Sequence, residues 1–251
     1  MTNRDILETA MRQSAIDLNC RMEDFSAPGN RIVVSKPHPQ ARKYLTLPFD
    51  CNLVSYGKAI VASVRPELRK TVMTYISRFP PEHCFETPAL HILDNALQPF
   101  GLQTCFMAEY FLPDLNRLEE RSCDCEIRLM GPEDFQTLYL PRWSNALCEK
   151  RKHLDLLGAG AFRNGQLIGL AGASADCDTM YQIGIDVLPE YRRKGIGSAL
   201  TSRLALEILK QDKVPFYCAA WSNIRSVRNA INCGFRPAWV ELTVKPIGFV
   251  P

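Results

Sequence analysis

The chain has 251 residues, of which 46% are hydrophobic and 23% charged, a balance typical of a folded protein and unlike that of a disordered chain. Its length fits one large domain or two of about 120 residues each. A net charge of +3 is too small to indicate nucleic acid or an anionic membrane as the main partner, so any anion binding should be local.

The N-terminal segment and the cysteines indicate a cytoplasmic protein. Acidic residues interrupt the apolar residues of the first segment, so it predicts an amphipathic helix and no secretory signal. The longest apolar runs are far short of a membrane span. The ten cysteines are therefore expected to stay reduced, and without a CxxC pair they predict no metal site.

The first half of the chain predicts a small α/β domain. Its apolar residues alternate in the expected strands and recur at helical spacing in the expected helices. In chain order we expect a helix over 1–20, strands over 30–37, 51–57 and 58–64, helices over 66–79 and 87–101, and a strand over 104–112. The polar segment 113–124 has little apolar periodicity, so we place a boundary there, between domains 1–121 and 122–251.

The second half predicts a mixed α/β domain with a central sheet. We expect a strand over 125–130, helices from 132 and over 145–157, strands over 160–165, 166–175 and 180–187, a helix over 196–209, a strand over 214–221, a helix over 223–234, and strands over 235–244 and 248–250. The helix over 223–234 is expected to bury Ile224, Val227, Ala230 and Ile231 on one face.

Residues 188–209, LPEYRRKGIGSALTSRLALEIL, carry three cations and two glycines directly before a long apolar helical pattern. The first turn of a helix exposes unpartnered N–H groups and the positive end of its dipole. Gly195 and Gly197 allow close approach of a ligand, and Arg192, Arg193 and Lys194 can add charge-assisted hydrogen bonds. The loop therefore predicts a phosphate or pyrophosphate site. A solvated helix start would not account for this combination of glycines and cations.

Two other phosphate motifs fail at named positions. A triphosphate loop requires GxxxxGK followed by Ser or Thr, whereas Lys194 here precedes Gly195. A dinucleotide fingerprint requires GxGxxG, and Leu200 stands where the third glycine should be. The pattern that fits is RxxGxG, at residues 192–197.

These residues resemble the GNAT superfamily of acyl-CoA-dependent N-acyltransferases. The resemblance covers residues 125–245: the RxxGxG loop, a later segment with Asn223 and the pair Gly234-Phe235, and a strand-helix-helix start at 125–157 follow in the family's order. It implies a GNAT-type mixed central sheet flanked by helices in the C-terminal domain. A smaller N-terminal α/β domain of unknown role precedes it, as in a bacterial two-domain subgroup.

The resemblance also implies how acetyl-CoA, the co-substrate, is held. The strand over 180–187 would separate from the strand over 214–221, with pantetheine in the gap and one backbone N–H polarising the thioester carbonyl. The residues implied are Ile185, Val187, Arg192, Arg193, Lys194, Gly195, Ile196, Gly197, Ser198, Asn223 and Ser226. Arg225 or Arg228 is an open candidate for the 3'-phosphate. Asn223 is also expected to cap its helix.

The identities of the general base and the general acid stay open. Family members often carry a carboxylate or His where Tyr181 and Ile183 stand here, and a Tyr where Ala230 stands. The bases that we consider are Asp176 and Asp178, acting through water, and Glu241. Tyr217 is the candidate acid that protonates the departing thiolate.

Two functions compete. The leading hypothesis is an N-acetyltransferase that moves acetyl from acetyl-CoA to a primary amine by direct attack in a ternary complex. The acceptor is expected to be a small-molecule amine, a peptide N-terminus or a lysine. The alternative is a catalytically degenerate acyl-CoA-binding or regulatory module. Neither function calls for a metal, nucleic acid or membrane. Whether the protein forms a homodimer is left open.

Overall fold

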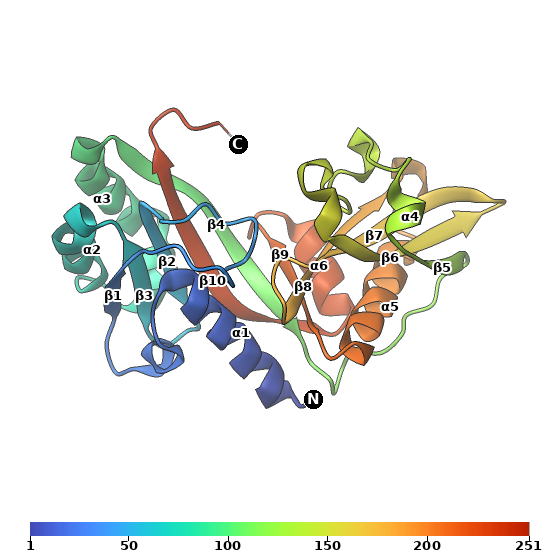
Figure 1. The fold of residues 1–251 in the computed structure, drawn as a ribbon, viewed down its shortest axis with the longest axis horizontal. Coiled ribbons are helices and arrows are strands. Elements are labelled where there is room, and N and C mark those ends of the chain that lie inside the picture. The colour runs from blue at the N-terminus through green and yellow to red at the C-terminus, as the bar shows by residue number, and fades with distance from the viewer. Residues whose placement is uncertain (251) are drawn as a thin grey trace. The chain divides into compact units, whose positions relative to one another are not determined.

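The computed structural model describes residues 1–250, which form two compact units (Figure 1). Unit 1 comprises Met1–Thr9 and Phe111–Pro237, and unit 2 comprises Ala10–Tyr110 and the chain from Ala238 onward. This division differs from the expected boundary at 121/122, because strands β4 (Leu102–Pro113) and β10 (Phe235–Pro246) each contribute residues to both units. Among residues 1–250, no helix combines the length and apolar character needed to cross a bilayer.

The sheet of unit 2 has the strand order β1-β3-β2-β10-β4. Strand β1 is parallel to β3, and β2 is antiparallel to both β3 and β10. The elements are α1 (Asn3–Leu18, with its first residues in unit 1), η1 (Met22–Ser26), β1 (Arg31–Val34), β2 (Cys51–Ser55), β3 (Ile60–Val64), η2 (Pro66–Leu68), α2 (Arg69–Ile76), η3 (Pro81–Phe85), α3 (Thr87–Leu97), η4 (Gln98–Phe100), β4 (Leu102–Pro113) and β10 (Phe235–Pro246).

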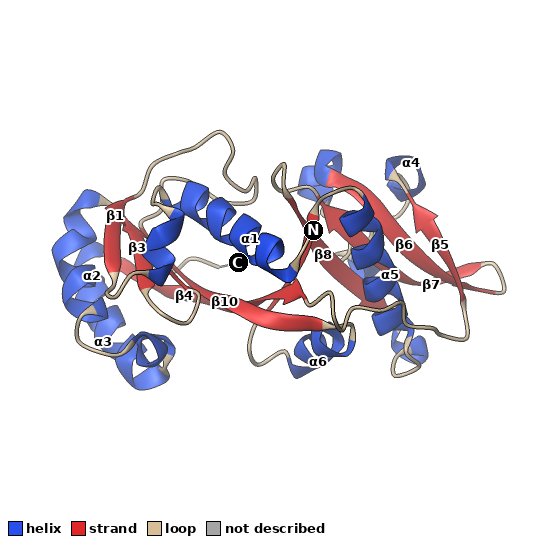
Figure 2. Ribbon diagram, turned by 90° about the horizontal axis from the view of Figure 1, so that it is seen from below, coloured by secondary structure: helices blue, strands red, loops and turns tan. Residues whose placement is uncertain are grey.

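The two faces of this sheet follow from strand alternation. Ala62 and Val64 of β3 join the buried cluster formed with α2 and α3. Ser63, between them, points to the other face, where its hydroxyl donates to the carbonyl of Leu18 at the end of α1 (2.8 Å). Figure 2 shows α1 on a different side of these strands from α2 and α3. Both faces are therefore covered, which explains why β2 and β3 are buried at every residue.

The sheet of unit 1 has the order β9-β8-β7-β6-β5. Strands β5 to β8 pair antiparallel in sequence, whereas β8 and β9 are parallel. The elements are β5 (Glu126–Met130), α4 (Pro132–Phe135), η5 (Pro141–Trp143), η6 (Glu149–Leu154), β6 (Asp155–Arg163), β7 (Gln166–Ser174), β8 (Met180–Val187), η7 (Pro189–Tyr191), α5 (Ile196–Lys210), β9 (Val214–Ala219) and α6 (Ile224–Asn232). The predicted mixed α/β fold is confirmed.

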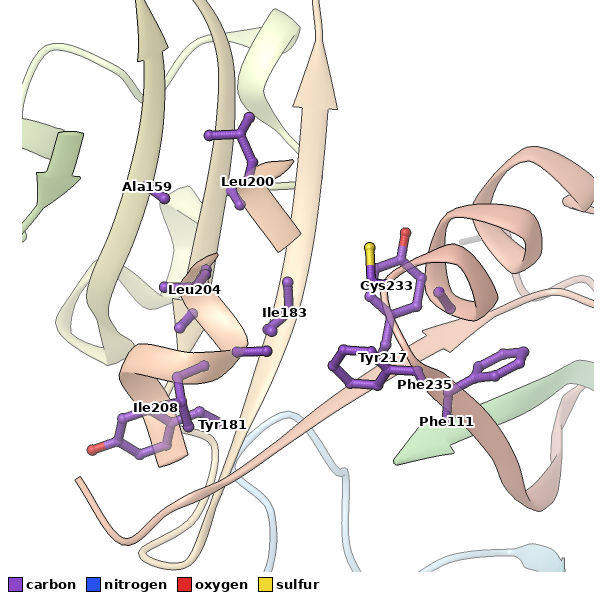
Figure 3. Packing of buried hydrophobic residues seen from close by; sticks show 14 of the residues in the cluster. Phe111, Ala159, Tyr181, Ile183, Leu200, Leu204, Ile208, Tyr217, Cys233 and Phe235 are labelled. Carbon is purple, nitrogen blue, oxygen red and sulfur yellow. The ribbon is translucent and has the colours of Figure 1, made fainter. Parts of the chain in front are cut away.

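Helix α5 covers one face of this sheet. Its Leu200, Leu204 and Ile208 are fully buried in a cluster that includes Ile183 of β8 (Figure 3). The opposite face is covered by the chain around residues 143–147, which approaches so closely that a Cβ on Gly184 would collide with the carbonyl oxygen of Asn145. Strand β8 is thus enclosed from both sides.

The helix expected over 145–157 is wrong. Short 3-10 turns occupy part of this range, and β6 begins at Asp155. The backbone N–H groups of Asn145 and Ala146 donate to the carboxylate of Asp186, and that of Cys148 donates to Asp155. These side-chain acceptors replace the carbonyl acceptors that a continuous helix would use.

Two further expectations near the C-terminus are also corrected. Ala230 is buried, but Ile224 and Ile231 of α6 are 50% and 43% exposed. Helix α6 packs on α5 and β9, and Ala230 is its fully buried residue. No strand forms at 248–250, since Gly248 has a φ of +85° and the N–H of Phe249 closes a turn onto the carbonyl of Pro246.

Candidate functional site

The parallel strands β8 and β9 separate after three residue pairs. Met180, Tyr181 and Gln182 pair with Val214, Pro215 and Phe216, and the pairing stops there. Strand β8 continues to Val187, and β9 continues to Ala219. Figure 3 shows Ile183 and Tyr217 just beyond this point, on the two strands as they diverge. The separation that the family resemblance implied is therefore present.

The main chain of β8 directs alternate residues toward this separation. The N–H of Leu188 donates to the carbonyl of Ile168 on β7 (3.0 Å). Because hydrogen-bonded residues alternate along an antiparallel strand, Gly184 and Asp186 also face β7. Ile183, Ile185 and Val187 therefore direct their N–H and C=O groups to the side of β9, where no strand pairs with them.

Arg192 is hydrogen-bonded to one of these main-chain groups. Its guanidinium Nε donates to the carbonyl of Val187 at 2.8 Å. The N–H of Val187 and both main-chain groups of Ile185 stay directed at the separation. Arg192 therefore holds the end of β8 and the start of the loop together, in addition to its charge.

The loop between β8 and α5 makes a sharp turn. Arg193 and Gly195 both have positive φ, +62° and +77°, and α5 begins at Ile196. The N–H groups of the first helical turn have no intrahelical acceptor, an arrangement that favours an anion. Arg192, Arg193 and Lys194 are exposed, and none of them makes an ion pair with a carboxylate within residues 1–250.

Glycine is favoured at the two positions of the loop for different structural reasons. At Gly195 the reason is the backbone, because its φ favours glycine and a Cβ would meet only the carbonyl of Ser122, at 3.7 Å. At Gly197 the reason is helix packing, because a Cβ would lie 3.2 Å from Oδ1 of Asn229 on α6. Ser198 donates to the same Asn229 oxygen (3.1 Å). Gly197 and Ser198 thus fix α6 against the start of α5.

Asn223 and Ser226 lie at the start of α6. The side chain of Asn223 accepts a hydrogen bond from the N–H of Ser226 (3.3 Å), so the expected cap is present. The hydroxyl of Ser226 lies 2.7 Å from that of Tyr217 on β9. Tyr217 is 2% exposed. Burial raises the pKa of its hydroxyl, and the hydrogen bond with Ser226 offsets part of the rise.

The carboxylates predicted as bases have different surroundings. Asp176 is completely buried; its carboxylate accepts from the hydroxyl of Ser174 (3.2 Å) and lies 4.0 Å from Nε of Arg151. Asp178 is exposed in the turn before β8. The strands separate at Ile183, three residues beyond the start of β8 at Met180, or about 10 Å along the strand. Asp178 precedes Met180 and is therefore farther than this from the separation along the strand.

Glu241 belongs to unit 2 and is part of a buried ionic cluster there. Its Oε1 accepts from Nη2 of Arg42 (2.7 Å) and from the indole N–H of Trp239 (2.8 Å). Asp17 pairs with the same guanidinium. These bonds engage Oε1 of Glu241 in the buried cluster and give the carboxylate a structural role.

Asp186 is a residue of this region that was not predicted from the sequence. Its carboxylate accepts three hydrogen bonds, from the N–H and side-chain amide of Asn145 (2.9 and 2.7 Å) and from the N–H of Ala146 (3.0 Å). Asp186 thereby ties segment 143–147 to β8. Because these partners lie about 40 residues away, no local signal in the sequence could have found them.

A second missed feature is a cavity of about 410 Å³ beside the loop. Gly195, just before α5, and Ser198 in its first turn line this cavity. Ile231 and Asn232 line it from the end of α6, and Arg117 and Arg121 from the segment predicted as a linker. The local signal there was weak, because these arginines alternate with Glu119 and Glu120. The described residues contain no cluster of three His, Cys, Asp or Glu side chains suited to a metal.

Fold and site together define an α/β domain in which two parallel strands separate beside the N-terminus of helix α5. Residues 115–235 match the model of the acetyltransferase (GNAT) family. This segment, just under half of the chain, is therefore a GNAT domain, and the residues before it are additional. No curated protein is found to match the chain.

Several solved structures are similar to part of the chain. A putative GNAT acetyltransferase from Novosphingobium aromaticivorans is 19% identical, with 57% of this chain and 66% of that chain covered and a TM-score of 0.45. A GCN5-related N-acetyltransferase-like protein from Streptococcus suis is 19% identical, with 62% and 69% covered and a TM-score of 0.46. The aminoglycoside N-acetyltransferase AAC(6')-Iy in complex with CoA is 20% identical, with 53% and 98% covered and a TM-score of 0.37. The chain thus spans about two thirds of the length of the first two.

Proposed function

We propose that the protein is an N-acetyltransferase that moves an acetyl group from acetyl-CoA to a primary amine by direct attack in a ternary complex. The observation that carries the proposal is the separation of β8 from β9 directly before the loop 192–198. A thioester arm needs an extended slot with main-chain partners, and its pyrophosphate needs an anion-binding end. Strand β8 and the start of α5 offer both in one continuous stretch of chain.

In this proposal, the donor is held by main-chain groups more than by side chains. Ile185 and Val187 contribute their N–H groups, one of which polarises the thioester carbonyl. The N–H groups of Ile196, Gly197 and Ser198 bind the pyrophosphate, together with Arg193 and Lys194. Asn223 and Ser226 border the donor site from α6.

The transfer requires a balanced movement of protons. The amine nitrogen attacks the thioester carbon, the C–S bond breaks, the amine loses a proton and the CoA thiolate gains one. We assign protonation of the CoA thiolate to Tyr217. A tyrosine hydroxyl carries its proton at neutral pH, and burial raises the pKa of Tyr217 further. For the loss of the amine proton, Asp178 is the exposed carboxylate among the three considered, since those of Asp176 and Glu241 have protein partners. Because Asp178 precedes β8 and lies more than about 10 Å along the strand from Ile183, it acts in this proposal through a chain of waters.

The acceptor in this proposal is a small-molecule amine, a peptide N-terminus or a lysine side chain, and the enzyme acts in the cytoplasm. The ten cysteines, all free of disulfides, agree with a reducing compartment. A homodimer stays a prediction.

A second function has specific support. Tyr181 and Ile183, at the positions where the family often has a base, are 8% and 2% exposed, and two of the three candidate carboxylates are engaged. An acyl-CoA-binding module without catalysis would share the donor site and lack turnover.

Calorimetric titration with acetyl-CoA, followed by CoA release against a panel of amines, separates these functions. We expect binding, and CoA release with at least one amine. Replacing both Arg193 and Lys194 with Gln should weaken binding tenfold or more, since charged hydrogen bonds contribute about 1.5–3 kcal/mol each. Arg128→Gln, a surface arginine paired with Glu126, is the matched control. Absence of binding at millimolar acetyl-CoA would refute both functions, and binding without turnover would favour the second.

A further inference from the structure

Segment 114–122 is built into unit 1 beside the donor loop. The N–H of Arg121 donates to the hydroxyl of Ser202 on α5 (3.0 Å), and Glu120 pairs with Arg203 on the same helix (3.0 Å). The guanidinium Nε of Arg121 donates to the carbonyl of Asn232 at the end of α6 (3.1 Å). The segment therefore has fixed contacts with both helices, unlike a free linker.

Gly234 gives an independent sign of this fit. A Cβ on Gly234 would lie 2.6 Å from the carbonyl oxygen of Arg117, and the residue has a φ of +86°. The chain around Arg117 thus passes through space that only glycine leaves open. Because the contact is with backbone, it positions Arg117 at the cavity whatever its own side chain does.

The walls of the cavity have the chemistry of a phosphorylated nucleoside site. Arg117 and Arg121 offer two exposed guanidinium groups, the form of cation best suited to a phosphate. Ile231, 43% exposed, gives an apolar surface for a ring, and Ser198 and Asn232 add polar groups. The ion pair of Arg121 with Glu119 (2.6 Å) is exposed, so a phosphate can replace it at small cost.

The cavity adjoins the proposed pyrophosphate site, because Gly195 and Ser198 belong to both. A ligand that binds the loop by its pyrophosphate can therefore extend into the cavity. Its size falls within the range of about 300–1,000 Å³ usual for ligand pockets. Arg225 and Arg228, the cations of α6 considered for the 3'-phosphate, are not among its lining residues.

We propose that Arg117 and Arg121 bind the 3'-phosphate of CoA and that the cavity between segment 114–122, α5 and α6 holds its adenosine. This inference rests on the proposed function and specifies the donor end of the same site. It makes the segment before β5 part of the donor site and assigns CoA selectivity to two arginines that lie outside the RxxGxG loop.

The test compares CoA with 3'-dephospho-CoA in calorimetric titrations of the full chain. The unaltered protein should bind CoA at least tenfold more tightly than dephospho-CoA. Arg117→Gln and Arg121→Gln should each weaken CoA binding about tenfold and leave dephospho-CoA binding unchanged, so that the double variant no longer distinguishes the two ligands. Arg128→Gln, which removes the same charge away from the cavity, should keep the full preference.

Three outcomes would overturn the inference while leaving the proposed function intact. They are equal binding of both ligands by the unaltered protein, a full preference in the double variant, and loss of preference in Arg225→Gln or Arg228→Gln instead. If the unaltered protein binds neither ligand, the proposed function itself fails. Because Arg121 also contacts Asn232, thermal unfolding should accompany the titrations, and Arg117→Gln alone decides the matter if Arg121→Gln does not fold.

Discussion

Replacing Tyr217 with Phe tests the proposed proton donor. The change removes one hydroxyl that lies 2.7 Å from the hydroxyl of Ser226 and keeps the buried ring. Loss of one buried hydrogen bond costs about 1 kcal/mol of stability. Loss of a general acid costs about 10² to 10⁴ in rate. We therefore expect a small fall in the unfolding midpoint and a fall in kcat of at least 100-fold, with KM for acetyl-CoA little changed.

The pH profile gives a second reading of the same group. Burial raises the pKa of Tyr217 above its ordinary value of about 10, and the protonated form is the active one. The acid should thus stay protonated between pH 7 and about pH 9.5, so Tyr217 should cause no loss of kcat in that range.

Tyr75→Phe in unit 2 is a matched control. Tyr75 is 3% exposed, and its hydroxyl donates to the carbonyl of Cys84 (2.8 Å), so the same atom is lost from a similar setting. It should reduce stability by a similar amount and leave kcat unchanged. CoA release under saturating acetyl-CoA is the assay. A Tyr217→Phe enzyme with kcat within twofold of the unaltered protein would refute the assignment.

Three other predictions concern stability and the loop. Arg42→Met should lower the free energy of unfolding in urea by about 3–5 kcal/mol, because it leaves two buried carboxylates without their cation. Arg65→Met, at a half-buried ion pair, should lower it by under about 1 kcal/mol. Equal losses in the two variants would contradict this prediction. Gly184→Ala should cost about 1–3 kcal/mol through its collision with the Asn145 carbonyl, unlike Gly131→Ala, which has open space. Gly195→Ala should cost about 1 kcal/mol and Gly195→Asn less, since Asn tolerates positive φ; if a Cβ blocks the donor, both should lose acetyl-CoA affinity equally in titrations.

The sequence was most informative where a signal is local. The strand, turn and helix start predicted around residues 192–197 lie in one contiguous stretch and are present as β8, the loop and α5. The separation of β8 and β9, by contrast, was expected only from the family resemblance. The cap at Asn223 was equally readable, since its acceptor atom and the N–H it binds are three residues apart.

The misses came from contacts between distant residues. Asp186 captures the N–H groups of Asn145 and Ala146, and this interaction prevents a helix that the local pattern favours. Glu241 was considered as a base because it carries a carboxylate. In the structure that carboxylate accepts a hydrogen bond from Arg42, 199 residues away in the sequence. The apolar pattern of α6 indicated burial, although Ile224 and Ile231 receive no covering element in residues 1–250.

The glycines of the two family motifs have packing and backbone roles that are separate from any ligand. Gly195 is required by its φ, Gly197 by Asn229, and Gly234 by the carbonyl of Arg117. Bulky substitutions at these positions would therefore shift the backbone, α6 or segment 114–122 before they met a bound molecule. A loss of acetyl-CoA binding in such variants would follow from either cause. The exposed cations Arg117, Arg193 and Lys194 give the sharper test of the donor site, because their removal changes charge while leaving the packing around them intact.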